Sequence, residues 1–430
     1  MQKLRSLKHV LIERYNRTTP QIDNIPIAGL FADCLSHPPI ERYCRVGFKY
    51  PLCILYSSGT TGAPKCIVHS TGGTLIQHIK EHRLHSDISE KDTLFYFTTC
   101  GWMMWNWLVS GLMMQSRVIV YKGNPFYPGP ERLWQIAEAE KMTLFGTSAK
   151  YIDAVRKSGL KPASAFDLSH LRMLCSTGSP LSSEGFGFVY QAIKQDIQLA
   201  SISGGTDIMG CFVLGCPTKP VYAGEIQARA LGMAVAILND EGQQIEGEQG
   251  ELCCLAPFPS MPVGFWNDSD GSRYYSAYFE VYPDIWRHGD WATHTPNGGI
   301  IIHGRSDATL NPGGVRIGTA EIYRIVESFD EVAESLVIGQ MVEHDVRIVL
   351  FLRMAENENL DDKLQARIKD ALKRQASPRH VPAIILSVRD IPRTRSGKIT
   401  ELAVRDVIQG RRVKNTEALA NPEALEAFKN

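Results

Sequence analysis

Residues 56–65 combine hydroxyls, glycines and one lysine, and they directly follow an apolar run at 52–55. Glycine lets backbone N–H groups approach phosphate oxygens, hydroxyls add hydrogen-bond donors, and lysine supplies a positive charge. A strand leading into such a loop predicts a phosphate site, with a nucleoside triphosphate as the ligand. A serine- and glycine-rich surface turn is the alternative. The residues that could bind phosphate are Ser57, Ser58, Gly59, Thr60, Thr61, Gly62 and Lys65.

This loop differs from the common P-loop, in which the lysine directly follows the second glycine and precedes Ser or Thr. Here Ala63 and Pro64 separate Gly62 from Lys65, and Cys66 follows the lysine. The segment therefore predicts a phosphate loop of another type.

Five further motifs follow along the chain, and each of them alone could be an ordinary turn. The first contains Gly178, Ser179 and Pro180 after an apolar run. The second occupies residues 201–207, and the third ends at Asp290. The fourth spans residues 304–316, with two glycines near its end, and the fifth is a basic segment that ends at Lys398.

In this order, the motifs resemble those of the adenylate-forming enzymes, a superfamily that activates a carboxylate with ATP and passes the acyl group to a thiol. The resemblance implies an ATP site, Mg²⁺ and, for a CoA ligase, CoA as co-substrate. It assigns the adenine to the loop at residues 178–180 and the ribose to Asp290. An ionised carboxylate suits a ribose because it offers two acceptor oxygens and no donor.

The resemblance also assigns the reacting groups. Thr206 contacts the adenylate phosphate, and Lys398 is the catalytic lysine of the C-terminal motif. Asp207 stands where most relatives have Glu, so it is expected to hold Mg²⁺ directly or through water, since Mg²⁺ keeps several of its waters. The further nucleotide-binding residues implied are Gly205, Arg305 and Arg316.

Two further assignments concern the domain movement between activation of the carboxylate and transfer of the acyl group to the thiol. The resemblance makes Asp307 the hinge between a large and a small domain, and it places Gly313 and Gly314 at the tunnel for the CoA thiol. A side chain at either glycine could obstruct the pantetheine. A domain that presents Lys398 first and this loop second explains why a hinge is needed.

Within the superfamily, the chain is most similar to members that activate acetoacetate. Gly204 stands where acetate-activating relatives have a tryptophan, so the resemblance predicts an acyl pocket at Gly204 and Trp102 with room for a longer acid. Another short acid, such as butyrate, is an alternative. A third possibility is a nucleotide-binding or interaction protein without catalysis, because relatives carry a long portion before the phosphate loop and the large domain is expected to be incomplete.

Composition limits the classes of partner. The 430 residues are 44% apolar, and 46 Lys and Arg balance 46 Asp and Glu, so no net charge attracts nucleic acid or an anionic membrane. The most apolar segment, residues 102–114, is too short to span a bilayer and is expected to be a buried helix. Ten cysteines without a C-x-x-C pair indicate reduced thiols and a cytosolic location. Composition does not indicate the oligomeric state.

The apolar patterning predicts an α/β fold with mainly parallel strands, among them 117–121 and 171–176, and crossover helices at 130–141 and 182–194. Residues 225–303 change to short apolar runs separated by Gly, Pro and Asn, which predicts an antiparallel β subdomain. Beyond residue 305 the order of helices and strands predicts a small α+β domain. We therefore expect a large domain at residues 1–306 and a mobile C-terminal domain at 307–430.

Overall fold

The computed structural model describes residues 7–14, 21–22, 24–25, 27–56, 65–312, 315–342, 345–395, 397–413 and 416–429. The chain forms two compact units, residues 1–46 and 47–430. In the first unit, β1 (Val10–Ile12) pairs in parallel with β2 (Ala28–Leu30), and α1 (Phe31–Cys34) follows directly.

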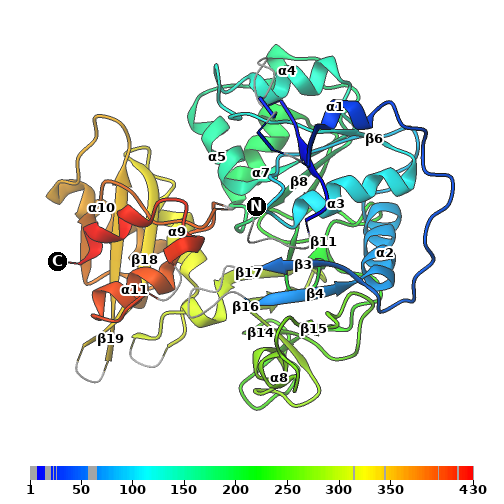
Figure 1. Ribbon diagram of the computed structural model, residues 1–430. Helices are drawn as coiled ribbons and strands as arrows, with labels where there is room; N and C mark the ends of the chain where they lie inside the picture. The colour runs from blue at the N-terminus through cyan, green and yellow to red at the C-terminus, as the bar shows by residue number, and fades with distance from the viewer. Residues whose placement is uncertain are drawn as a thin grey trace. The chain divides into compact units, whose positions relative to one another are not determined.

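The second unit contains a five-stranded parallel sheet, of which β6 and β8 are labelled in Figure 1. Its strands, in spatial order, are β6 (Arg117–Ile119), β5 (Thr93–Tyr96), β7 (Leu144–Ser148), β8 (Met173–Thr177) and β9 (Gln198–Ser201). Apolar side chains cover both faces of this sheet. Leu94 and Tyr96 belong to one core and Phe95 to the other, as expected from the alternation of side chains along a strand.

Helices cover both faces of the parallel sheet. The core that contains Phe95 is closed by α4 (Arg132–Ala139), α5 (Ala149–Lys157) and α7 (Ser183–Phe188), and α7 continues as η3 (Val189–Ile193). The other core includes α3 (Met104–Ser110), which continues as η2 (Gly111–Met114). A helix is therefore confirmed in the predicted segment, with α3 buried and Leu112 and Met113 of η2 exposed. The remaining helices of this region are α2 (Thr71–Lys80), η1 (Glu81–His85), α6 (Pro162–Ala165) and α8 (Ser272–Tyr278).

Three antiparallel sheets complete the region of residues 47–306, here called the large region. The largest has the order β13 (Val235–Leu238), β14 (Gln249–Cys254), β16 (Trp286–His294) and β17 (Ile300–Arg305), which confirms the predicted antiparallel segment. The second joins β3 (Pro51–Tyr56), β4 (Cys66–Ser70) and β15 (Gly264–Phe265). The third joins β10 (Ser203–Gly205), β11 (Gly210–Leu214) and β12 (Ala228–Arg229).

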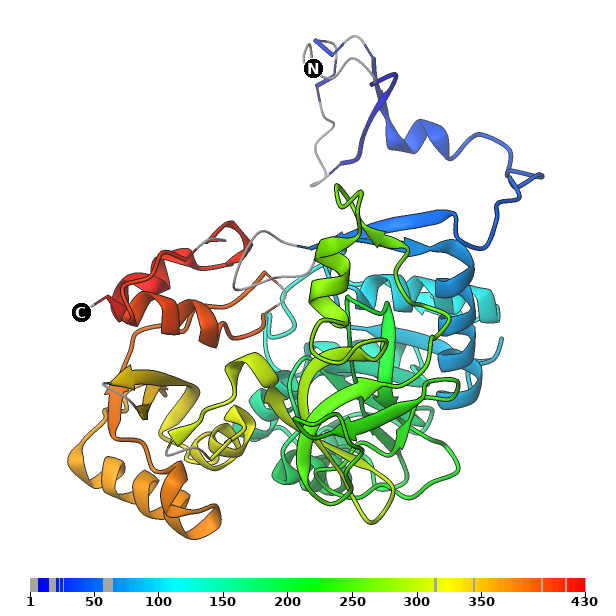
Figure 2. The ribbon, with the colours of Figure 1, turned by 90° about the horizontal axis from the view of Figure 1, so that it is seen from below.

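The small region, from residue 307 onward, is built on β18 (Val332–Val342), β19 (Asp345–Met354) and β20 (Ile384–Ser387). One face of this sheet packs on α9 (Thr319–Val326) and α10 (Asp362–Gln375). The other packs on α11 (Glu401–Ile408) and η8 (Pro422–Phe428) (Figure 2). The short turns η4 (Ser306–Ala308), η6 (Pro378–His380) and η7 (Thr416–Ala418) complete it.

The α/β class and the α+β character of the small region are as predicted. Its two cores contain only residues between Leu310 and Phe428, which supports a separate domain, although the boundary at 306/307 stays a prediction. In the described part of the chain, every helix is too short or too polar to span a bilayer.

Candidate active site

Asp207, Lys65 and Tyr278 meet where the second and third antiparallel sheets approach α8. Asp207 follows β10, and its Oδ1 lies 3.1 Å from the Lys65 Nζ just before β4. The hydroxyl of Tyr278, at the end of α8, donates a 2.6 Å hydrogen bond to the same oxygen. The structure therefore brings together Lys65 and Asp207, which the sequence motifs predicted, and adds a tyrosine that they did not.

Tyr278 is itself fixed by aromatic packing. Its ring stacks on Trp286 with centroids 3.7 Å apart, and the Lys65 Nζ lies 4.7 Å from its centroid in a cation–π arrangement. The ring thus supports both the lysine and the hydroxyl that meet at Asp207. Neither motif spacing nor periodicity could have found it; the only signal was the clustering of tyrosines in α8.

Asp207 is held in its ionised form. Burial alone would raise its pKa, but the Lys65 ammonium and the Tyr278 hydroxyl lower the pKa below its usual range. Both of these partners bind Oδ1, and among the described residues no donor binds Oδ2. An oxygen of an ionised carboxylate is thus available to Mg²⁺ or to one of its waters, so the residue fits the predicted metal role.

Asp207 alone would not complete the coordination of a Mg²⁺ ion. Among the residues that the structure describes, no three His, Cys, Asp or Glu side chains gather to hold a metal ion. Mg²⁺ is commonly bound by one or two carboxylates together with waters and substrate phosphates, so the rest of its coordination would have to come from the nucleotide and water.

Asp290 and Arg305 form a second polar cluster on neighbouring strands. The Arg305 Nη1 lies 3.2 Å from Asp290 Oδ1, and the Ser203 hydroxyl donates to Oδ2 at 3.3 Å. Gly289 has φ +86°, and a Cβ there would lie 2.7 Å from the guanidinium of Arg305, so glycine permits this approach. Each carboxylate oxygen has two lone pairs, which leaves Asp290 able to accept further hydrogen bonds from a ribose.

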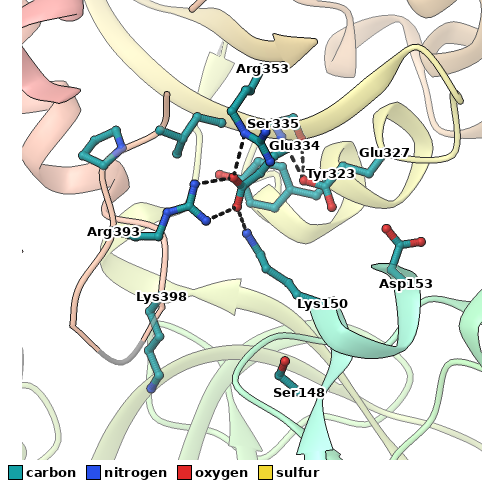
Figure 3. A network of polar contacts seen from close by, with 12 residues as sticks. Ser148, Lys150, Asp153, Tyr323, Glu327, Glu334, Ser335, Arg353, Arg393 and Lys398 are labelled. Carbon is teal, nitrogen blue, oxygen red and sulfur yellow. Dashed lines mark hydrogen bonds and ion pairs between the residues drawn. The ribbon is translucent and has the colours of Figure 1, made fainter. Parts of the chain in front are cut away.

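Lys398 belongs to the small region, and members of these two clusters influence its charge. Surrounding protein atoms desolvate its ammonium group and the Arg305 guanidinium repels it, and together they lower its pKa, while Asp290 and Asp207 act in the opposite direction. Its side chain nevertheless stays exposed to solvent. In Figure 3 it extends away from the sheet of the small region. Arg305, Asp290 and Asp207 are thus the charged groups that act on the Lys398 ammonium.

The motif at residues 201–207 is tied to its surroundings by its backbone. The Thr206 carbonyl lies 2.8 Å from His69 Nε2. Burial lowers the pKa of His69 to about 4, so its neutral ring donates this bond at neutral pH. The Thr177 hydroxyl donates to the Ile202 carbonyl at 3.0 Å and thereby links the predicted adenine loop to the same segment. His69 was missed by the sequence motifs.

The predicted adenine loop follows the carboxyl end of β8, where ligands commonly bind in open parallel sheets. Gly178 has φ +91°, a conformation that favours glycine. Ser179 is half-buried and Pro180 is exposed. Near this loop, Gly205 leaves only 3.3 Å between an added Cβ and the ring of His288.

Gly204 has a structural role in addition to the one predicted. A Cβ at this position would lie 2.0 Å from the Gly210 carbonyl oxygen, so glycine is needed for the close approach of β10 and β11. Trp102 is half-buried and packs edge-on against Tyr96 with centroids 6.1 Å apart. Their common role in an acyl pocket stays a prediction.

Two further predicted residues differ in their contacts, since Asp307 Oδ1 lies 3.5 Å from the Arg305 Nε of the second cluster. Arg316 forms a 2.7 Å ion pair with Asp240 and lies over the ring of Trp291, so in this structure it does not join the cluster around Asp207. Asp307 is exposed, and its carbonyl accepts a 3.3 Å hydrogen bond from Arg405 of α11. The residues predicted to bind phosphate or CoA but lying outside the described residues are Ser57, Ser58, Gly59, Thr60, Thr61, Gly62, Gly313 and Gly314.

Two family profiles match this arrangement of regions. The profile described as AMP-binding enzyme matches residues 44–261, and that described as AMP-binding enzyme C-terminal domain matches residues 321–398. The chain belongs to the AMP-binding enzyme family.

Two of the proteins similar to this chain carry the same name. Acetoacetyl-coenzyme A synthetase of Rhizobium meliloti (strain 1021) is 64% identical over 384 residues, which are 89% of this chain and 59% of the relative. Acetoacetyl-CoA synthetase of Gallus gallus is 47% identical over 436 residues, covering 99% of this chain and 65% of the relative. The chain thus spans less than two thirds of the length of these relatives.

Solved structures agree on the fold. The structure of acetoacetyl-CoA synthetase from Streptomyces lividans superposes with a TM-score of 0.92 at 42% identity, covering 100% of this chain and 66% of that one. The anthranilate CoA ligase AuaEII in complex with anthranoyl-AMP has a TM-score of 0.73 at 20% identity and covers 86% of this chain and 69% of that one. The second likeness concerns the fold alone.

Proposed function

We propose that this chain activates acetoacetate with ATP to give acetoacetyl-AMP and pyrophosphate, and then transfers the acyl group to CoA with release of AMP. The observation that carries the proposal is the meeting of Lys65, Tyr278 and Asp207, because it holds an ionised carboxylate beside a lysine. The Asp290–Arg305 pair on the neighbouring strands adds a second polar group for the nucleotide. The names of the similar proteins support the choice of acid and thiol.

The first half-reaction brings two anions together. A carboxylate oxygen of the acid attacks the α-phosphorus, and the bond to the pyrophosphate oxygen breaks. Charge neutralisation is the main task of the protein in such a transfer. Lys398 would approach the reacting phosphate from the small region, and Lys65 would approach the leaving phosphates. Asp207 would hold Mg²⁺, which supplies further positive charge to the phosphate oxygens.

The nucleotide would be oriented by groups that do not react. Asp290 would accept hydrogen bonds from the ribose hydroxyls, held in place by Arg305 and Ser203. The loop at 178–180 would pack on the adenine, and the Thr206 hydroxyl would contact the adenylate phosphate. Gly205 would leave space beside this phosphate, and Arg316 would join the nucleotide only after moving from Asp240.

In the second half-reaction, the CoA thiol attacks the acyl carbonyl, its proton passes to solvent, and AMP leaves. We infer that Asp307 is the pivot that moves Lys398 away and brings Gly313 and Gly314 to the thiol. A boundary at 306/307 would make the small region the mobile domain. None of the ten cysteines, all of them among the described residues, forms a disulfide, which is compatible with a cytosolic enzyme.

The substrate and the activity are tested together with a panel of acids. Acetoacetate, butyrate and acetate are each added to the chain with ATP, Mg²⁺ and labelled pyrophosphate, and ATP–pyrophosphate exchange is measured, followed by thioester formation with CoA. Exchange that is fastest with acetoacetate supports the proposal. Faster exchange with butyrate would favour the alternative acid, and nucleotide binding without exchange for any acid would favour a non-catalytic protein.

A further inference from the structure

A buried carboxylate joins the two regions. Glu334 of β18 is almost fully buried, with 6% of its side chain exposed, and it pairs with three cations (Figure 3). The Arg393 Nη2 and Nη1 lie 2.6 Å and 3.3 Å from its two oxygens, and the Arg353 Nε lies 3.5 Å away. The third cation, Lys150, comes from the large region and binds Oε1.

The charges in this network favour an ionised Glu334. Burial alone would raise its pKa, but Lys150 and Arg393 lower the pKa below the usual range. The neighbouring Glu327 is different, because burial raises its pKa while it accepts hydrogen bonds from the amide and hydroxyl of Ser335. The three cations therefore pair with Glu334. Arg393 also lies 3.2 Å from Asp390.

Lys150 stands on a helix that is fixed in the large region. It lies in the first turn of α5, whose N-cap Ser148 accepts a hydrogen bond from the Tyr151 amide. Two turns later on the same face, Lys157 donates a 3.0 Å hydrogen bond to the Val332 carbonyl at the start of β18. Helix α5 therefore contacts β18 at two points, through Lys150 and through Lys157.

Arg393 continues the connection to the turn that carries Lys398. This turn is closed by a 2.8 Å hydrogen bond from the Thr394 amide to the Lys398 carbonyl and by one of 3.1 Å from the Lys398 amide to the Thr394 hydroxyl. Beyond the turn, Glu401 accepts a 3.0 Å hydrogen bond from Tyr323. Both ends of the turn are thus anchored, and Glu334 connects one of them to Lys150.

We propose that Lys150, through Glu334 and Arg393, is a positioning residue that holds the Lys398 turn over the nucleotide site for adenylate formation. The inference rests on the proposed function, because it assigns the contact to one of the two half-reactions. An ion pair that keeps 35% of the lysine side chain exposed can separate when the small region turns for thioester formation, since water then solvates the released ammonium.

The test compares three variants in the two half-reactions. Lys150→Met removes the charge, Lys150→Arg keeps it, and Arg156→Met removes a charge of the same helix whose ion pair is with Asp153 within α5. We expect Lys150→Met to slow acetoacetate-dependent pyrophosphate exchange at least about tenfold, and to leave thioester formation from supplied acetoacetyl-AMP equal or faster. Lys150→Arg should retain most of the exchange, and Arg156→Met should resemble the unaltered chain.

A second measurement needs no substrate. Hydrogen–deuterium exchange of the amides at residues 393–400 should become faster in Lys150→Met and stay unchanged in Arg156→Met. If the unaltered chain shows no pyrophosphate exchange with any acid, the proposed function fails while this comparison still decides whether Lys150 orders the turn. The inference is overturned if amide exchange is unchanged in Lys150→Met, or if both half-reactions fall equally in a variant with an unaltered melting temperature.

Discussion

At the scale of single residues, the site depends on groups that hold other groups in place. Tyr278 is an example, because its hydroxyl reaches the carboxylate of Asp207 while its ring stacks on Trp286 and supports Lys65. A hydrogen bond to a charged group contributes about 1.5–3 kcal/mol. Asp207 would keep only its ion pair if this bond were removed.

We therefore predict that Tyr278→Phe raises the KM for Mg·ATP about tenfold or more, since roughly 1.4 kcal/mol corresponds to a factor of ten. The ring and its stacking remain, so the melting temperature should fall by a few degrees only, as expected for the loss of one hydrogen bond, and KM is measured well below the transition. Tyr274→Phe is the matched control on the same helix, because the Tyr274 hydroxyl reaches only the Pro262 carbonyl, at 3.4 Å. Equal KM values for the two variants would remove Tyr278 from the nucleotide site.

Gly204 is the residue at which the space for a side chain can be tested most simply. An added Cβ would meet the Gly210 carbonyl oxygen at 2.0 Å, so Gly204→Ala should destabilise the fold by about 1–3 kcal/mol through overpacking. Gly187→Ala in α7 is the control, since a Cβ added there meets no described atom within 4 Å and alanine favours a helix. Thermal melting measures both, and an unchanged midpoint for Gly204→Ala would contradict the close strand contact.

At the scale of elements, the long helix formed by α2 and η1 buries several histidines. His78 and His82 have pKa values lowered to about 4 and about 3, mainly by burial. Their rings lie against the Met209 carbonyl and against the Trp107 carbonyl. Both histidines must therefore be neutral in the folded protein at physiological pH.

This burial predicts a pH dependence of stability with a definite sign. The usual pKa of 6.5 applies to the unfolded chain, so the unfolded state binds more protons as pH falls from about 6.5 to about 4. Stability should be fully present above pH 6.5 and decline by about 1.4 kcal/mol per pH unit for each histidine below it. Urea unfolding at several pH values measures the slope. His82→Gln should reduce it and the exposed His170→Gln should not; equal slopes in both would refute the assignment.

Elements with a local signal could be predicted from the sequence. The strand β8 and the helix α4 follow apolar patterning and lie within two residues of their expected bounds. The pairing of β4 with β15 could not be predicted, because it joins segments almost two hundred residues apart. The π-helical η1 also escaped prediction, since its residues continue the pattern of α2.

The candidate active site likewise contains residues with a local sequence signal and residues without one. Lys65, Asp207, Asp290 and Lys398 stand in motifs that the sequence makes visible, whereas Tyr278 and His69 contribute through long-range contacts alone. Lys150 has no motif either, because its role depends on where α5 meets β18. Sequence reasoning finds residues whose local chemistry is unusual, and it misses ordinary residues that the fold brings to them.

At the scale of the whole molecule, the two regions must come together for one half-reaction and then separate. Lys398 belongs to the small region, yet the charged groups that act on it, Arg305, Asp290 and Asp207, belong to the large region. A substitution of Lys398 therefore tests two claims: that the site is assigned correctly, and that the small region uses this lysine in only one of the two half-reactions.

The most direct test of this claim is Lys398→Ala in the two half-reactions, with folding checked by thermal melting. Acetoacetate-dependent ATP–pyrophosphate exchange should fall by about 10²–10³, the usual effect of removing one preorganised electrostatic donor. Thioester formation from supplied acetoacetyl-AMP and CoA should continue at the rate of the unaltered chain. Exchange that survives at an undiminished rate in the folded variant would contradict the account.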